Sequence, residues 1–342
     1  MVTGATGLIG GEVVITLANA GRPVCALVRA ASHAQARQRL FERLEKSSAF
    51  RRDLVHLIDA VSGDTAREMF GTTQWSPGGI GAVVHCAADT KFSGSESVWH
   101  TNVAGARNLV ALVRAVSPAA RVVFVSTASV VTDPAGACLD EDAPYAGHAN
   151  TYTRSKREAE AIVGVSRLDA VIVRPSIVLS RGVRDRAMAR SILWAVQIMR
   201  ELGDVPIDPH AHIDFVPVDW VVCAILRLAE KPALKHRRYH VSAGRGSFSF
   251  TQLREEVIKH HPELRGVRPR GRNAQISHRA LARLLRPLEL YLPFINADVR
   301  YENDRLAEEI GASALPPSAT AYLPGLIGQV SLREAYEEMH QP

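Results

Sequence analysis

The feature that most constrains this chain is a glycine-rich stretch close to its start, Thr3-Gly4-Ala5-Thr6-Gly7-Leu8-Ile9-Gly10. Its three glycines separate a short apolar segment from the helical pattern of residues 12–18. In a strand–turn–helix unit, Gly4 would make the tight turn, Gly7 would let the backbone approach a pyrophosphate, and Gly10 would let the helix pack closely on the sheet. Unpaired N–H groups at the start of that helix favour an anion. Because strand, turn and helix come in the order that the motif requires, the stretch predicts a dinucleotide site.

The strand in front of the turn is short. Only Met1, Val2 and Thr3 precede Gly4, whereas strands usually have about five or six residues. Either this strand is unusually short or further residues precede this sequence, and the sequence alone leaves both explanations open.

Length and composition are those of a globular protein. The 342 residues suffice for one large α/β domain with a smaller lobe, and 46% hydrophobic with 22% charged residues is ordinary. No run approaches the roughly eighteen apolar residues that span a bilayer, and we expect no signal peptide, because the glycine turn begins almost at residue 1. The four cysteines stand alone, which favours reduced thiols over disulfides or zinc. We therefore expect a cytoplasmic protein that binds no metal. The cysteines are Cys25, Cys86, Cys138 and Cys223.

Apolar strand patterns alternate with amphipathic helices along most of the chain. This alternation is typical of a parallel, doubly wound α/β sheet, a Rossmann fold. We expect strands at 23–29, 54–58, 82–88, 121–125, 170–174 and 239–242, and helices at 12–18, 34–46, 101–116, 152–163 and 220–230.

The regular alternation ends after Ser176. Residues 191–202 read as a helical excursion, residues 213–219 return to the sheet, and the chain after Gly244 is mostly helical. We expect a smaller, mainly helical substrate lobe over the nicotinamide end of the cofactor. The predicted division gives residues 1–178 and 207–243 to the nucleotide-binding domain and residues 179–206 and 244–342 to the lobe.

The end of the second strand bears on the choice of cofactor. Many dinucleotide folds place an acidic residue there to accept hydrogen bonds from the adenosine ribose, but this strand ends in Arg29. A cation suits a 2′-phosphate, so we expect NADPH rather than NADH, with a solvated arginine as the alternative. Arg37 and Arg39 on the following helix either assist or face solvent.

Polar residues that suit proton transfer follow the fifth strand. That strand runs into Ser126-Thr127-Ala128-Ser129, and a later helix opens with Tyr152 and carries Lys156. A spacing of four residues puts Tyr152 and Lys156 on one helical face. Together with the glycine turn, these residues resemble the extended short-chain dehydrogenase/reductases over roughly residues 1–242. Further matches are His85-Cys86-Ala87-Ala88, Asn102 and Arg174-Pro175.

Within that group the chain resembles the thioester reductases. These include terminal reductase domains of peptide and polyketide synthases, carboxylic acid reductases and fatty acyl-CoA reductases. Nucleotide-sugar epimerases more often carry a tyrosine–glycine pair where this chain has Val131-Thr132-Asp133. The resemblance implies NADPH-dependent reduction of an acyl thioester, on coenzyme A or a carrier protein, to an aldehyde or alcohol. It is carried by Leu27-Val28-Arg29, His85-Cys86-Ala87-Ala88-Asp89, Val125-Ser126-Thr127 and Asp214-Phe215-Val216-Pro217-Val218-Asp219.

The implied chemistry is hydride transfer to a carbonyl, with a proton supplied to the developing alkoxide. Tyr152 would donate the proton, Thr127 would hydrogen-bond the carbonyl oxygen, and Lys156 would hold the nicotinamide ribose. The ordinary pKa of tyrosine is about 10, so action near pH 7 requires a pKa lower by roughly 3. We expect a desolvated cleft with Lys156 nearby to lower it, because a cation favours the phenolate. Ser126 and Ser129 are alternatives to Thr127.

The residues predicted to bind the cofactor come from the glycine turn, the strand ends and the catalytic helix. They are Thr3, Gly4, Thr6, Gly7, Leu8, Ile9, Gly10, Arg29, Asp64, Ala87, Tyr152, Lys156, Pro175 and Ser176. Other polar residues are expected to be structural: His85 at a strand end, Asn102 bracing backbone near the site, and Asp214 and Asp219 capping or orienting loops.

Two other functions remain open. One is a sugar-nucleotide epimerase or dehydratase, or a ketone or sterol dehydrogenase, on the same scaffold. The other is an NADP-binding redox sensor without catalysis, which would have no need of Thr127, Tyr152 and Lys156. The acyl group, the thiol carrier and the oligomeric state are not specified by the sequence.

A basic segment lies between Leu264 and Leu288. In a chain of net charge +6, it suggests capture of the phosphates of coenzyme A or of a carrier protein's pantetheine arm; an ordinary solvated face fits equally well. It lacks the interleaved aromatics that stack on bases, so we expect no nucleic acid. Leu281, Leu284, Leu285 and Leu288 predict a core face rather than lipid contact, and we expect no integral membrane segment. The segment carries Arg265, Arg268, Arg270, Arg272, Arg279, Arg283 and Arg286 without an acidic residue.

Overall fold

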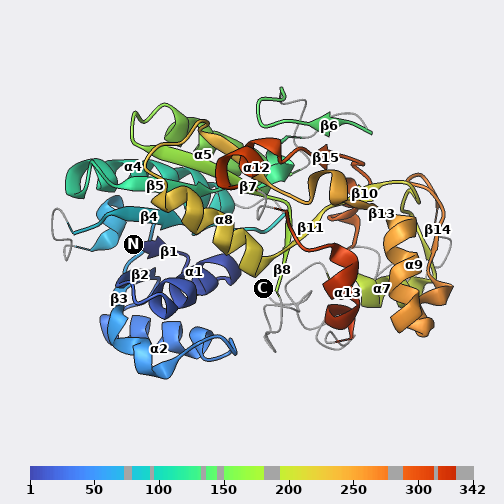
Figure 1. Cartoon of the computed structure of the whole chain (residues 1–342), viewed down its shortest axis with the longest axis horizontal. Helices are drawn as coiled ribbons and strands as arrows, with labels where there is room; N and C mark the ends of the chain where they lie inside the picture. Colours follow the sequence, from blue (N-terminus) through green and yellow to red (C-terminus); the bar gives the residue numbers. More distant parts are fainter. Residues whose placement is uncertain are drawn as a thin grey trace.

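Parallel strands form one twisted sheet at the centre of the larger domain (Figure 1). The protein is described by a computed structural model, which covers residues 1–72, 79–92, 96–131, 136–144, 150–180, 193–275, 288–311 and 315–328. The order across this seven-stranded sheet is β12-β7-β5-β4-β1-β2-β3, with every neighbouring pair parallel. The predicted doubly wound Rossmann fold is therefore confirmed. The strands are β1 (Val2–Thr3), β2 (Val24–Val28), β3 (Ile58–Ser62), β4 (Ala82–His85), β5 (Arg121–Val125), β7 (Ala170–Pro175) and β12 (Arg238–Val241).

The sheet reverses its winding direction between β1 and β4. Thr3 pairs with Leu27 of β2 on one side and with His85 of β4 on the other. In open α/β sheets, ligands bind outside the carboxyl ends of the strands at such a switch point. The glycine turn follows Thr3 directly, so the topology places it there.

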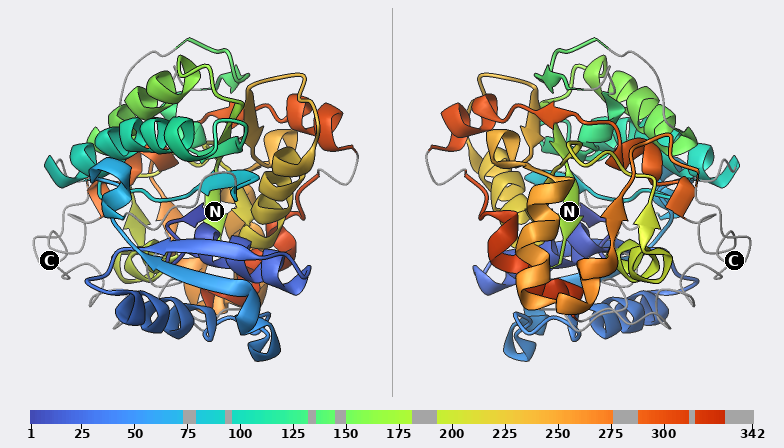
Figure 2. Two further views of the ribbon diagram at one scale, coloured as in Figure 1. Left: turned by 90° about the vertical axis from the view of Figure 1, so that its left-hand side faces the viewer. Right: turned by 90° about the vertical axis from the view of Figure 1, so that its right-hand side faces the viewer.

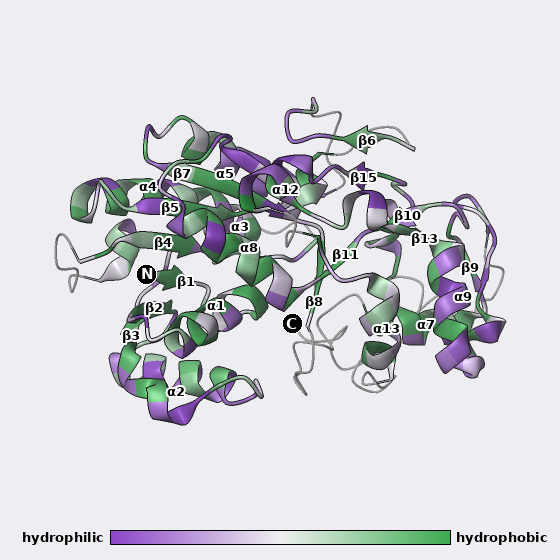
Figure 3. Cartoon of the chain, viewed as in Figure 1, coloured by the Kyte–Doolittle hydropathy of each residue, from purple (hydrophilic) through white to green (hydrophobic). Residues whose placement is uncertain are grey.

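Helices cover both faces of the sheet (Figure 2). One face packs against α1 (Leu8–Asn19), α2 (His33–Leu44) and α8 (Val218–Glu230), which share a single buried apolar cluster with the strands. The other face packs against α4 (Gly105–Val116) and α5 (Thr151–Gly164) in a second cluster. Because both faces are covered, the inner strands consist mainly of apolar residues, and most of their length is green in Figure 3.

The central strand β1 is short in the structure as well. It pairs with its neighbours through two residues, whereas β2 and β3 pair through five. Beyond Met1, a cleft of about 1030 Å³ opens between β2 and β4. The Met1 ammonium group donates a hydrogen bond of 2.7 Å to the Ala82 carbonyl at its edge.

The third strand begins four residues later than the sequence predicted. Residues Arg52–Leu57 form a 3₁₀ turn, and β3 follows at Ile58–Ser62. The apolar run 54–58 suggested a buried strand, but β3 is the edge strand of the sheet. An edge strand tolerates an exposed charged residue such as Asp59, which interrupts the apolar pattern of β3 in the sequence.

Residues 213–219 do not return to the main sheet, contrary to the prediction. β11 (Phe215–Pro217) instead pairs in parallel with β8 (Ile177–Leu179), and the two form a separate ribbon. The last predicted strand does return, since β12 joins the edge of the main sheet beside β7. An apolar strand pattern specifies burial, and both positions bury their side chains, so the pattern could not distinguish them.

The predicted substrate lobe contains an apolar core of its own. The cluster joins α7 (Trp194–Leu202), α9 (Phe250–His260), α11 (Leu292–Ile295) and α13 (Ala319–Ile327). These helices lie to one side of the sheet in Figure 1. The cluster includes Ile213 and Phe215, which the predicted division gave to the nucleotide-binding domain. The division of the chain into two domains stays a prediction.

Short elements complete the described chain. α3 (Glu96–Trp99) and a π-helix at His100–Ala104 precede α4, and α12 (Asp304–Ile310) packs on β12 and α8. Small two-stranded pairs join β6 (Cys138–Leu139) to β15 (Arg300–Tyr301), β9 (Asp204–Val205) to β14 (Arg268–Pro269), and β10 (His212–Ile213) to β13 (Phe248–Ser249). Among the described helices, none combines the length and apolar character needed to cross a membrane.

Candidate active site

The glycine turn needs glycine at two positions for steric reasons. Gly4 has a φ of +67°, and a Cβ there would lie 2.7 Å from the Ala87 nitrogen. A Cβ on Gly10 would lie 2.3 Å from the Gly4 carbonyl oxygen. Helix α1 can therefore pack this closely on the turn only because Gly10 has no side chain. Because real Cβ atoms essentially never come within 3.0 Å of such backbone atoms, both positions exclude alanine without rearrangement.

The turn presents the start of α1 to the expected phosphates. Gly7 precedes the helix without a side-chain cap, and the first helical turn carries no acidic residue. Thr6 and Gly7 are exposed, while Leu8 and Ile9 are half-buried. The start of α1 is uncapped, and a ligand can reach it past the exposed Gly7. This arrangement fits a pyrophosphate, because the N–H groups and the dipole at a helix start favour negative charge.

Thr3 and His85 hold the loop beside the turn. The Thr3 hydroxyl lies 3.0 Å from His85 Nδ1 and accepts a hydrogen bond of 3.2 Å from the Ala87 N–H. His85 stacks on Phe124 with ring centroids 5.5 Å apart, and burial lowers its pKa to about 3. His85 is therefore neutral and structural. The Thr3 side chain is fully buried, so its hydroxyl fixes Ala87, and a contact of Thr3 with the cofactor stays a prediction.

The carboxyl ends of β2 and β3 form the expected adenosine side of the site. Arg29 is exposed, and the Arg39 guanidinium donates to the Arg29 carbonyl, which brings a second cation to the same place. Arg37 lies over the Phe41 ring instead. Asp64 accepts a hydrogen bond of 3.0 Å from the Ala66 N–H and so caps the turn after β3.

The three predicted catalytic residues come together at the end of β5. Thr127 follows that strand, and its side chain hydrogen-bonds the Tyr152 side chain from α5. Lys156 lies one turn further along α5, where its ammonium group donates a hydrogen bond of 2.7 Å to the Val125 carbonyl. Ser129 hydrogen-bonds Tyr301 instead, so the structure favours Thr127 over Ser129 as the partner of Tyr152.

The protonation of this group differs from the sequence prediction. Burial raises the pKa of Tyr152 to about 12, and the hydrogen bond from Thr127 offsets this only in part. Burial also lowers the pKa of Lys156 to about 8, against the raising effect of the nearby Glu160 carboxylate. The Lys156 ammonium is held by the Val125 carbonyl and lies 4.4 Å from the Phe124 ring centroid. The expected lowering of the Tyr152 pKa is therefore wrong for the protein alone.

Asn102 fixes the loop after β4 to the catalytic helix. Its side-chain NH₂ group donates hydrogen bonds to the Asp89 carbonyl (2.9 Å) and to the Ser155 hydroxyl (2.8 Å). Its side-chain oxygen accepts a hydrogen bond of 2.8 Å from the Asp89 N–H. Ser155 lies between Tyr152 and Lys156 in α5. The predicted bracing role of Asn102 is confirmed, and the π-helix at His100–Ala104 sets its position.

A buried ion pair anchors the same helix to the neighbouring strand. Arg174 of β7 and Glu160 of α5 make contacts of 2.9 and 2.6 Å in a bidentate arrangement, with both side chains almost fully buried. Arg174 also donates 3.0 Å to the carbonyl of Glu141. Glu141 is buried too and accepts a hydrogen bond of 2.9 Å from the His240 N–H. It belongs to residues 133–150, which the sequence predicts to be an acidic loop containing proline and glycine; residues 132–135 and 145–149 lie outside the described residues.

Asp214 orients the loop that follows β12. One of its carboxylate oxygens accepts two hydrogen bonds, one of 2.5 Å from the Ser176 hydroxyl and one of 2.8 Å from the Ala243 N–H. Burial raises the pKa of Asp214 to about 6. The predicted loop-orienting role is confirmed. Because the Ser176 hydroxyl is used in this way and Pro175 is buried, contacts of these two residues with the cofactor stay predictions.

An aromatic cluster beside Tyr152 was not foreseen from the sequence. The Phe92 ring lies 5.9 Å from Tyr152, 4.7 Å from Tyr291 and 4.8 Å from Phe294, measured between centroids. Trp194 adds an edge contact of 5.1 Å to Tyr291. Phe92 is 60 residues from Tyr152 and about 200 residues from Tyr291 and Phe294. No local sequence pattern links residues so far apart, so only the fold could bring them together.

The basic segment is less charged than its sequence suggested. Arg268 and Arg270 both pair with Asp204, at 2.7 and 3.1 Å, and Arg272 pairs with Asp208 at 3.0 Å. β14 runs beside β9, so the missing acids come from a distant part of the chain. Arg279, Arg283 and Arg286 lie outside the described residues, as do Leu281, Leu284 and Leu285. Leu288 is fully buried in the lobe core.

Comparison with known proteins gives the same assignment as the geometry. The family described as male sterility protein, an NAD-binding group, matches residues 2–225. The chain belongs to this family. It is an oxidoreductase of the extended short-chain dehydrogenase/reductase type, with a nicotinamide dinucleotide as its cofactor.

Similar proteins include synthetases and solved reductase domains. The nonribosomal peptide synthetase asaC of Aspergillus flavus is 25% identical over 266 residues, which are 70% of this chain and 26% of that protein. The chain thus spans about a quarter of the length of that relative. The terminal R domain of the myxalamid PKS-NRPS pathway is 21% identical with a TM-score of 0.74, covering 99% of this chain and 90% of that one. The Bordetella bronchiseptica enzyme WbmH in complex with NAD⁺ is 19% identical with a TM-score of 0.66, covering 98% and 97%.

Proposed function

We propose that this protein is an NADPH-dependent reductase of acyl thioesters. The observation that carries the proposal is the group of Thr127, Tyr152 and Lys156, set at the carboxyl end of β5 beside the glycine turn. The likeness to terminal reductase domains supports a thioester over a sugar nucleotide. The proposed catalytic residues are Thr127, Tyr152 and Lys156, and the proposed cofactor contacts are those predicted from the sequence.

Tyr152 acts as the proton donor in this proposal. When bound, the nicotinamide cofactor would supply the hydride that adds to the thioester carbonyl carbon and turns the carbonyl oxygen into an alkoxide. Tyr152 gives its proton to that oxygen, and Thr127 donates a hydrogen bond to it. The resulting hemithioacetal then collapses: its hydroxyl gives up its proton as the C–S bond breaks, the departing thiolate takes up a proton, and an aldehyde is released. The Tyr152 phenolate regains a proton from solvent. A second hydride and proton would convert the aldehyde to an alcohol.

The raised pKa of Tyr152 suits the reductive direction. A donor must hold its proton until the alkoxide forms, and a phenol with a pKa of about 12 is fully protonated at neutral pH. The alkoxide formed on the former carbonyl carbon is at least as strong a base as this phenolate, so the proton can pass from Tyr152 to it. Lys156, with a pKa near 8, is still mostly cationic at pH 7, and its proposed role is to hold the nicotinamide ribose.

The preference for NADPH rests on Arg29 and Arg39. Both stand at the carboxyl end of β2, where an acid would serve the ribose of NADH. The proposed partners are coenzyme A or an acyl or peptidyl carrier protein that presents the thioester. We also propose a cytoplasmic location, which the four free thiols support.

The test is NADPH oxidation with a panel of acyl-CoAs, carrier-bound thioesters, free aldehydes and sugar nucleotides. We expect turnover with thioesters and aldehydes, and a loss of roughly two to four orders of magnitude in Tyr152→Phe with NADPH binding retained, the usual range for losing a proton donor. Ser166→Ala, which removes a buried hydroxyl two residues beyond the end of α5, serves as the control. Turnover restricted to sugar nucleotides, or near-normal turnover in Tyr152→Phe, would refute the proposal.

A further inference from the structure

The turn that follows β5 sets the direction of the Thr127 hydroxyl. It is a single 3₁₀ turn, Ala128–Val130, with Thr127 before it and Val131 after it. The Thr127 side chain accepts a hydrogen bond of 3.3 Å from the Ser129 N–H, and the same side chain is hydrogen-bonded to Tyr152. Because the Ser129 N–H takes one acceptor position of the Thr127 oxygen, the hydroxyl hydrogen is left to point at Tyr152. The contact between Thr127 and Tyr152 therefore depends on where the turn lies.

Tyr301, from the C-terminal part of the chain, fixes this turn at two points. Its hydroxyl is hydrogen-bonded to the Ser129 side chain and donates to the Val131 carbonyl at 3.5 Å. Tyr301 is 8% exposed, and its ring belongs to the same buried apolar cluster as Ala128 and Val130. The Tyr301 hydroxyl thus ties the middle of the turn to its end.

Tyr301 is itself anchored beside the main sheet. It lies in β15, opposite Leu139 of β6, and its carbonyl accepts a hydrogen bond of 2.8 Å from the Ser242 hydroxyl. Its ring meets the His240 ring of β12 edge to face, with centroids 5.4 Å apart. The main sheet and β6 therefore set the position of the Tyr301 hydroxyl, and the turn follows it.

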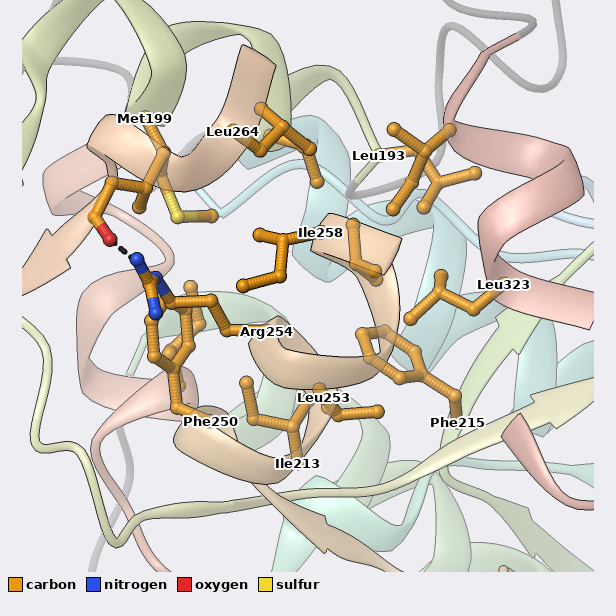
Figure 4. A pocket seen from close by; sticks show the side chains of 15 residues that line it. Leu193, Met199, Ile213, Phe215, Phe250, Leu253, Arg254, Ile258, Leu264 and Leu323 are labelled. Atoms are coloured by element: carbon orange, nitrogen blue, oxygen red, sulfur yellow. Dashed lines mark hydrogen bonds between the residues drawn. The ribbon is translucent and has the colours of Figure 1, made fainter. Parts of the chain in front are cut away.

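This contact is separate from the apolar core of the predicted lobe. Figure 4 shows a cavity within that core, lined by Leu193, Phe250 and Leu323 among others, and neither Tyr301 nor a residue of the turn lines it. Tyr301 also belongs to a different apolar cluster from the one that joins α7, α9, α11 and α13. A change at Tyr301 can therefore act on the turn without altering the lobe core.

We propose that Tyr301 is a positioning residue for the reaction, which holds the Thr127 hydroxyl on Tyr152 through the turn Ala128–Val130. The inference rests on the proposed function, in which both side chains act on the carbonyl oxygen. Without the Tyr301 hydroxyl the turn loses both of its tethers, and Thr127 shifts away from Tyr152. A misplacement of about 1 Å in a catalytic group can cost about a hundredfold in rate. The glycine turn is untouched by this change, so cofactor binding is kept.

The kinetic test compares Tyr301→Phe and Ser129→Ala with the unmodified protein, using NADPH and the thioester or aldehyde that is reduced fastest. Both variants should lower kcat by about ten- to a hundredfold and leave the KM for NADPH unchanged. In Thr127→Val, which already lacks the hydroxyl, Tyr301→Phe should lower kcat by less than about a further twofold, because the two changes act on one contact.

Tyr239→Phe is the matched control, since it removes another buried tyrosine hydroxyl, bonded at 2.6 Å to Glu309. It should lower the free energy of unfolding and leave kcat unchanged. An unchanged kcat in Tyr301→Phe, or an undiminished fall in the Thr127→Val background, would overturn the inference.

A spectroscopic measurement separates failure of this inference from failure of the proposed function. The seven tyrosines are labelled with ¹³C at Cζ, and the Tyr152 signal is assigned by its loss in Tyr152→Phe. That signal reports the hydrogen bonding of the phenol without any turnover. Tyr301→Phe should move it in the same direction as Thr127→Val does, even if no thioester is reduced. A Tyr152 signal that stays in place in Tyr301→Phe would overturn the inference, whatever the protein reduces.

Discussion

The ion pair between Glu160 and Arg174 gives the sharpest test of how the catalytic helix is held. Both side chains are buried, with exposed fractions of 3% and 1%, and they meet through a bidentate contact. Replacing Glu160 by Gln removes the negative charge that faces the buried Arg174 guanidinium, which keeps its hydrogen bond to the Glu141 carbonyl. Breaking a buried pair in this way costs about 3–5 kcal/mol. We therefore expect Glu160→Gln to lower the free energy of unfolding by that amount.

The assay is urea unfolding of three variants. Glu230→Gln breaks the exposed pair with Arg22, whose side chains are 53% and 59% exposed, and should cost less than about 1 kcal/mol. Replacing Glu160 by Leu and Arg174 by Met together removes both charges. Because no orphan charge remains, the double variant should be more stable than Glu160→Gln by about 2 kcal/mol or more. A loss under about 1 kcal/mol in Glu160→Gln, or a double variant that is less stable than it, would refute the reasoning.

Three further outcomes follow from the site and the core. Arg29→Ala should weaken NADPH binding at least tenfold and leave NADH binding nearly unchanged, measured by titration of each cofactor; equal affinities in the unmodified protein would contradict the assignment. Gly10→Ala should abolish cofactor binding, because its Cβ would lie 2.3 Å from the Gly4 carbonyl oxygen, whereas Gly164→Ala, with open space around its Cβ, should bind normally. Acidification from pH 7 to 5 should lower the free energy of unfolding by about 2–3 kcal/mol. His85 and His240 have folded pKa values of about 3, below the unfolded value near 6.5, so their stabilisation is lost as the pH falls below 6.5. Asp214, with a folded pKa of about 6, acts in the opposite direction and offsets about 1 kcal/mol; a stability that rises on acidification would contradict this balance.

The lobe and the nucleotide-binding domain meet through side chains that no local pattern links. Phe92 leaves the loop after β4 to contact Tyr291 and Phe294, and Asp298 accepts the His212 N–H at 3.0 Å across 86 residues. Such contacts depend on the path of the whole chain. The sequence could therefore predict a lobe but not which of its residues would approach Tyr152.

What the sequence determined by itself is local and short in range. The spacing of Gly4, Gly7 and Gly10 specifies the turn. A Cβ at Gly4 or Gly10 would clash with backbone atoms, and a Cβ at Gly7 would lie a tight 3.2 Å from the Gly4 carbonyl oxygen. A separation of four residues puts Tyr152 and Lys156 on one face of α5, whatever surrounds the helix. Unbroken apolar runs specify strands covered on both faces, which is why β5 was predicted with its bounds unchanged.

What only the tertiary structure decided depends on partners far away in the chain. The pKa of Tyr152 rises because burial outweighs its hydrogen bond to Thr127, and burial is a property of the packed molecule. Glu141 is buried because Arg174 and His240 reach it from other strands. Three arginines of the basic segment, Arg268, Arg270 and Arg272, pair with Asp204 and Asp208. In each case the sequence shows that the residue can carry a charge. The electrostatic energy of that charge depends on the dielectric and on the neighbouring groups, which only the folded structure determines.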